Sequence, residues 1–109
     1  MFVCVGESVA LEPEERAAIG PAVGAWIEEM EGRGIRLQGD QIAPAAEATT
    51  VRVRRGEVVV SGGPFAETEE RIAGFNILEC ADLDEAVEVA AKHPVARFGT
   101  LELRPFADG

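Results

Sequence analysis

A short alternating segment, residues 50–61, constrains the fold of this chain more than any other feature. Valines alternate with polar residues before Arg55-Gly56, a dipeptide suited to a two-residue turn, and three consecutive valines, Val58 to Val60, follow it. The cross-strand pairs that this turn predicts are Val53 with Val58, Val51 with Val60, and Arg54 with Glu57. Since one register satisfies both the apolar pairs and the charged pair, we predict a β-hairpin with this register.

Six other segments carry helix or strand patterns. Continuous or alternating apolar runs predict four strands, at residues 2–5, 35–37, 74–81 and 100–104. Apolar residues three and four apart predict two helices, one from Pro13 to Gly32 and one from the cap residue Asp82 to Pro94. The predicted stripe of the second helix is Leu83, Val87, Ala90 and Ala91. Gly20-Pro21 predicts a break or kink in the first helix.

The order of these elements predicts the fold class. With the hairpin treated as an insertion, the order is βαββαβ, the ferredoxin-like α+β arrangement. The 109 residues suffice for a single domain, 1–109. Two helices cover only one face of such a sheet, and the strands beginning at Phe2 and Gly74 leave apolar side chains on the other. We therefore expect a homodimer that closes face to face.

Composition excludes several classes of protein. The formal net charge is -10, and only Arg52, Arg54 and Arg55 cluster, so direct binding to nucleic acid is not expected. No apolar run reaches the roughly 18 residues of a membrane helix, and the N-terminus lacks the basic start of a signal peptide. These features predict a cytoplasmic protein without membrane contact. The bases are nine arginines and one lysine, which is typical of GC-rich bacterial genes.

The residues that ligate metals or act as nucleophiles are few. Cys4 and Cys80 lie far apart in apolar runs, which is typical of small buried side chains rather than of a disulfide or metal pair. His93 is the one histidine, so neither a metal site nor a cofactor is predicted. Two interpretations of His93 stay open. It is either an acid/base group or a positive charge that stabilises the end of the second helix beside Pro94.

Residues 63–70, Gly-Pro-Phe-Ala-Glu-Thr-Glu-Glu, resemble the DGPFAETKE signature of the YCII-related (DGPF-domain) family. Further matches to the family are Glu14-Glu15, Gly74-Phe75, Asp82 to Ala86, Pro94, Gly99, Glu102, Arg104 and Pro105. The resemblance covers nearly the whole chain. It implies a ferredoxin-like fold and a dimeric α/β barrel. Gly62 stands where the family has its leading aspartate, and Glu69 stands where it has lysine.

The resemblance also implies two classes of function. Some relatives in the wider superfamily use a His–Asp pair with the histidine on the first helix, and residues 21–30 contain no histidine. Other relatives occur with extracytoplasmic-function sigma factors. We therefore favour a ligand- or partner-binding module, with a sigma-factor-type regulatory partner as one version. The alternative is a small-molecule lyase, isomerase or dehalogenating-type enzyme that uses a pocket in the dimeric barrel.

The signature loop and the last strand supply a predicted pocket. Its residues are Gly63, Pro64, Phe65, Glu67, Glu102 and Arg104. The guanidinium of Arg104 suits a carboxylate, either a ligand's or that of a neighbouring glutamate. Simpler roles remain open: Gly63 in a turn with positive φ, Glu67 as a cap for backbone N–H groups, and Glu102 paired with Arg104.

Overall fold

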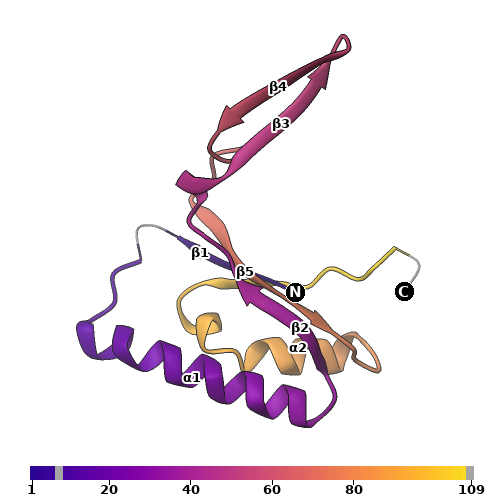
Figure 1. Ribbon diagram of the computed structural model, residues 1–109. Coiled ribbons are helices and arrows are strands. Elements are labelled where there is room, and N and C mark those ends of the chain that lie inside the picture. Colours follow the sequence, from indigo (N-terminus) through magenta and orange to yellow (C-terminus); the bar gives the residue numbers. More distant parts are fainter. Residues whose placement is uncertain (7–8, 108–109) are drawn as a thin grey trace.

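The computed structural model describes residues 1–6 and 9–107, and its centre is a four-stranded antiparallel sheet with two helices on one face (Figure 1). The sheet order is β2-β5-β1-β6. The strands are β1 (Phe2–Gly6), β2 (Arg36–Gln41), β5 (Glu70–Leu78) and β6 (Thr100–Glu102). The helices are α1 (Pro13–Gly32) and α2 (Leu83–Ala91), with short 3-10 turns η1 (Ala45–Glu47) and η2 (Pro94–Arg97). This mixed α+β topology is consistent with the ferredoxin-like arrangement. No helix within the described ranges has both the length and the apolar character needed to cross a bilayer.

The hairpin β3 (Thr49–Arg54) and β4 (Glu57–Gly62), here called the arm, forms a separate two-stranded sheet that projects away from the rest of the molecule (Figure 1). Its register has the three cross-strand pairs that the sequence predicts. Arg55 and Gly56 both have positive φ, 53° and 78°, as a type I′ turn requires. The radius of gyration is 16.1 Å, against about 13 Å for a compact chain of this length. The projecting arm accounts for this excess.

Helix α1 runs without interruption through Pro21, so the predicted break does not occur. Its start is held by the Glu12 N–H, which donates to Glu15 Oε1 at 3.2 Å. An interior proline costs a helix about 3 kcal/mol. The C-terminal half of α1 offsets this cost by burying Trp26 and Met30, each of which contributes a gain of about 2–3 kcal/mol.

The core lies between the two helices and the start of β2, and consists of Trp26, Met30, Ile35 and Val89. The predicted cap of α2 is confirmed, since the Glu85 N–H donates to Asp82 Oδ1 at 2.8 Å. The predicted apolar stripe of α2 is wrong in part. Leu83 and Val87 are exposed, whereas Val89 and Ala90 are buried. Val89 packs with Trp26 and Met30 of α1, and this contact decides which side of α2 is buried.

Several strands begin or end at residues other than those predicted from the sequence. β2 continues to Gln41 and β5 begins at Glu70, because each gains backbone hydrogen bonds along its neighbour. β6 ends at Glu102, two residues before the predicted end.

The face of the sheet that the helices leave uncovered is here called the open face. Val3 and Val5 line a cavity beside α1, so the alternate residues of β1 lie on the opposite face. The apolar residues that the register places on the open face are Phe2, Cys4, Ile72, Phe75 and Ile77. Both faces of the sheet therefore carry apolar side chains.

Candidate functional site

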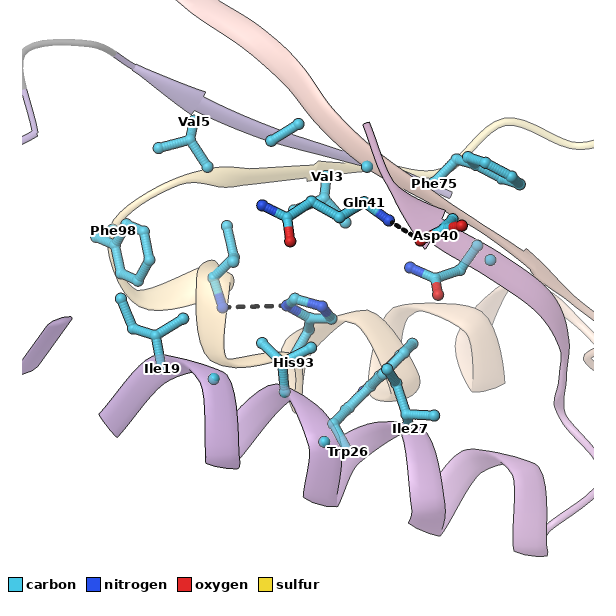
Figure 2. Close-up of a pocket in the computed structure, with 18 of the residues that line it drawn as sticks. Val3, Val5, Ile19, Trp26, Ile27, Asp40, Gln41, Phe75, His93 and Phe98 are labelled. Carbon is cyan, nitrogen blue, oxygen red and sulfur yellow. Dashed lines mark hydrogen bonds between the residues drawn. The ribbon is translucent and has the colours of Figure 1, made fainter. Parts of the chain in front are cut away.

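A cavity of about 750 Å³ lies between α1 and the helix-covered face of the sheet (Figure 2). Its wall is mostly apolar. The apolar side chains that form it are Val3 and Val5 from β1, Ile19, Val23, Trp26 and Ile27 from α1, and Val95 and Phe98 near η2. Gly20 and Gly24 lie on the same stretch of α1 and leave the space beside the helix open, since a Cβ atom on either would meet nothing within 4 Å.

His93 forms part of this wall and is only 4% exposed. It lies just before Pro94, and its extended backbone, with φ -68° and ψ 132°, is the conformation favoured before proline. Its Nδ1 accepts a hydrogen bond from the Val95 N–H at 3.1 Å. Its ring also packs at an angle against Trp26 of α1, with the ring centroids 4.7 Å apart. These contacts hold the imidazole in one orientation at the cavity wall.

Burial lowers the pKa of His93 below its ordinary value of 6.5, so the ring is neutral at pH 7. The interpretation of His93 as a positive charge at the helix end is therefore corrected. Because Nδ1 accepts the Val95 hydrogen bond, the one ring proton lies on Nε2. Within the described part of the chain, no hydrogen bond involves Nε2. His93 thus brings an unused N–H donor to a mostly apolar cavity.

Polar side chains from β2 and β5 complete the wall. Arg36 Nε donates to Asn76 Oδ1 at 2.7 Å, and Arg36 Nη1 pairs with Glu31 Oε2 at 2.8 Å. The side chain of Gln41 extends into the cavity on the side opposite His93 (Figure 2). Gly39 makes room for the Arg36–Asn76 contact, since a Cβ there would lie 2.5 Å from Asn76 Oδ1.

The sequence analysis did not identify Arg36, Gln41 or Asn76 as site residues. Asn76 carried a signal, because it is a polar residue between Phe75 and Ile77 in an otherwise apolar strand. It is buried, which in this position requires a hydrogen-bond partner. Its partner, Arg36, is 40 residues away, so only the pairing of β2 with β5 brings the two side chains together.

The residues predicted for the signature-loop pocket lie elsewhere. Gly63 and Pro64 are at the base of the arm, Glu67 is exposed, and Phe65 is 81% exposed. Glu102 and Arg104 form an exposed ion pair at 2.6 Å. None of these residues lines the cavity beside His93. The φ of Gly63 is 90°, which favours its role in a turn. The structure thus joins Glu102 to Arg104, and a pocket that also includes the loop stays a prediction for the assembled dimer.

Both cysteines are free and half-buried, and burial raises the pKa of each thiol. Cys80 packs against the core, in keeping with its predicted structural role. Across residues 1–6 and 9–107, no group of three metal-ligating side chains comes together.

Comparison with known proteins places this chain in a family. The model of the YCII-related domain matches residues 1–108. An uncharacterized protein of Rhizobium meliloti (strain 1021) is 42% identical over 69 residues, which are 62% of this chain and 56% of that protein. The chain therefore spans little more than half the length of this relative. The family match, by contrast, covers the fold from β1 to the end of the last strand, and the chain belongs to the YCII-related domain family.

Proposed function

We propose that this protein binds a small, mainly apolar molecule in the cavity between α1 and the sheet, and that His93 Nε2 donates a hydrogen bond to an oxygen of that molecule. The observation that carries the proposal is the buried, neutral imidazole, whose Nδ1 is occupied and whose Nε2 is not. His93 lines the cavity, and its free Nε2 N–H is a hydrogen-bond donor there. A ligand oxygen in the cavity would accept a hydrogen bond from this donor.

The size and character of the cavity support the same conclusion. Its volume of about 750 Å³ lies within the range of small-molecule sites, roughly 300–1,000 Å³. Such sites combine apolar walls with a few fixed polar groups. Here the walls are valine, isoleucine and aromatic side chains, the fixed polar group is His93, and the exposed Gln41 adds a polar side chain opposite it.

An isomerase or lyase that uses the same cavity is the alternative. Proton abstraction by Nε2 requires the ring proton to move to Nδ1, which would break the hydrogen bond from the Val95 N–H. The resting tautomer is that of a hydrogen-bond donor rather than of a base. This favours a binding module over an enzyme in which His93 abstracts a proton.

The partners of this module are also proposals. The apolar open face supports a homodimer that closes face to face, in which the signature loop, Glu102 and Arg104 would line a second pocket. The family resemblance supports a sigma-factor-type regulatory partner. Light scattering tests the homodimer, and a mass equal to one chain of 11.6 kDa at micromolar concentration would contradict it.

The test of the ligand site begins with mass spectrometry of the purified protein, to identify any molecule that copurifies. Binding is then measured by NMR with acetophenone, which is apolar and carries one carbonyl acceptor, and with ethylbenzene, which has no acceptor. Gly24→Leu should fill the cavity, and Gly32→Leu is the matched control at a position on the same helix that does not line it.

We expect acetophenone to bind and to shift the signals of His93, and we expect ethylbenzene to bind at least about tenfold more weakly. Gly24→Leu should abolish binding and Gly32→Leu should preserve it. The proposal is wrong if no molecule copurifies and acetophenone does not bind, or if Gly24→Leu binds as well as the parent protein.

A further inference from the structure

Arg36, the first residue of β2, places a positive charge in the wall of the cavity. Its side chain is only 9% exposed, so the guanidinium is largely shielded from bulk water. Nε donates to Asn76 Oδ1 at 2.7 Å, and Nη1 pairs with Glu31 Oε2 at 2.8 Å. Among the described residues, no hydrogen bond uses Nη2 of this side chain. The N–H groups of Nη2 are therefore donors that an added acceptor can occupy.

Gly39 and Asn76 bring a second donor close to this guanidinium. The two residues pair across β2 and β5, and both line the cavity. A Cβ atom on Gly39 would lie 2.8 Å from Arg36 Nη2, so the missing side chain leaves the space that the guanidinium occupies. Asn76 is buried, and because its Oδ1 accepts from Arg36, its Nδ2 is a donor that no hydrogen bond in the described ranges uses. Arg36 and Asn76 thus form a neighbouring pair of N–H donors in the cavity wall.

The charges around the cavity favour an anion. The charged side chains that line it are Arg16, Arg36 and Asp40, so its wall has a formal charge of +1 in a chain of net charge -10. Glu31, the ion-pair partner of Arg36, is 51% exposed and does not line the cavity, so it compensates the guanidinium from the solvent side. Arg16 and Asp40 are exposed, and water and salt screen their charges more than the charge of Arg36. The least screened charge in the cavity wall is therefore positive.

We propose that the molecule bound in this cavity is a carboxylic acid with an apolar body, whose carboxylate accepts hydrogen bonds from Arg36 Nη2 and Asn76 Nδ2. A guanidinium and a carboxylate form short, charge-assisted hydrogen bonds, which are stronger than those between neutral groups. The valine and isoleucine side chains of β1 and α1 contact the apolar body, and His93 Nε2 binds a second oxygen. This inference rests on the ligand site proposed above and adds the charge of the ligand.

NMR titrations at pH 7 test the charge by comparing 4-oxo-4-phenylbutanoate with its methyl ester. Both compounds carry the phenyl ketone of acetophenone, and they differ in the charge at the end of a flexible chain. Arg36→Gln removes the buried cation. Arg16→Gln is the matched control, because it makes the same change of charge at another residue of the cavity wall, near the start of α1. Circular dichroism and the binding of acetophenone check that each variant keeps the fold and the cavity.

The parent protein should bind the acid at least about tenfold more tightly than the ester. Arg36→Gln should reduce this preference to less than about threefold, and Arg16→Gln should leave it above about fivefold. In the parent protein, the Nε–H signal of Arg36 should shift more with the acid than with the ester, and this measurement decides the matter if Arg36→Gln does not fold.

Three results would overturn the inference. The acid binds no more tightly than the ester, the preference survives in Arg36→Gln, or the Nε–H signal of Arg36 responds equally to both compounds. In each case the binding of acetophenone would leave the ligand site itself in place. If neither the acid nor acetophenone binds, both this inference and the proposed ligand site are wrong.

Discussion

The indole of Trp26 meets the imidazole of His93 edge to face, with the ring centroids 4.7 Å apart and the ring planes at 66°. Trp26 also donates from Nε1 to the carbonyl of Val89 at 3.0 Å. One side chain of α1 thus contacts both α2 and His93, the residue that caps η2. Because Trp26 is buried and hydrogen-bonded, it positions the one histidine of the chain at the cavity wall.

The protonation of His93 provides the first prediction. Its pKa in the folded protein should lie below 6.5, because burial disfavours the imidazolium. Since the chain has one histidine, NMR titration of its ring signals reports this pKa directly. The nitrogen shifts at pH 7 should also show the proton on Nε2. A pKa above 6.5 or a proton on Nδ1 would show that the imidazole is held differently.

The same pKa shift predicts how stability depends on pH. Well above pH 6.5, His93 is neutral in both the folded and the unfolded chain and contributes no slope. As the pH is lowered through 6.5, the unfolded chain binds the proton before the folded chain does. The free energy of unfolding should therefore decrease with decreasing pH until the pH falls below the folded-state pKa of His93. Urea denaturation between about pH 7 and pH 5.5 measures this fall. His93→Gln should remove it, and an equal fall in that variant would assign the effect to other groups.

The third prediction concerns the bond from Trp26 to Val89. Trp26→Phe removes the donor, leaves the carbonyl of Val89 without that partner and reduces buried area, so it should lower the free energy of unfolding by about 1–3 kcal/mol. Phe106→Leu, at an exposed aromatic residue, should change it by less than about 0.5 kcal/mol. Urea denaturation of both variants makes the comparison, and equal effects would argue against the buried contact.

Gly99 should not tolerate a side chain. A Cβ atom there would contact the carbonyl oxygen of Cys4 and would lie 2.8 Å from Val95 Cγ1. Gly99→Ala should therefore destabilise the fold by about 1–3 kcal/mol through overpacking. Gly32→Ala is the control in the last turn of α1, where nothing lies within 4 Å of the added atom, and it should be neutral or stabilising by up to about 1 kcal/mol. Thermal unfolding should show a lower Tm for Gly99→Ala than for the parent protein, and an equal or higher Tm for Gly32→Ala. Equal Tm values for the two variants would contradict the close contact at Gly99.

The cap of α2 supplies the fifth prediction. Asp82→Ala removes the acceptor of the Glu85 N–H and should lower the free energy of unfolding by about 1 kcal/mol. Asp84→Ala, two residues later in the first turn, removes a negative charge near the helix N-terminus without removing a cap, and should cost only a few tenths of a kcal/mol. Chemical denaturation resolves this difference, and equal losses would mean that the dipole rather than the cap holds the helix start.

Local chemistry made the arm and the start of α2 predictable. The type I′ turn at Arg55-Gly56 and the alternation beside it act over a few residues, so the register follows without knowledge of the rest of the fold. The same holds for Asp82 and Glu85, whose side chains satisfy backbone N–H groups within one turn of the helix. The order of the elements and the family signature then pointed to the α+β fold.

Long-range packing decided the cavity and its chemistry. His93 lies 67 positions after Trp26, and Asn76 lies 40 positions after Arg36, so neither contact has a local pattern in the chain. The continuous path of α1 through Pro21 and the choice of Val89 over Val87 as a buried residue have the same origin. Amino-acid spacing specifies which faces a helix can bury, but the crossing of α1 and α2 over the sheet selects the one that is buried. The same packing buries His93 and so keeps its imidazole neutral. His93 is therefore a hydrogen-bond donor at the cavity wall, although its position at the end of a helix suggested a surface charge.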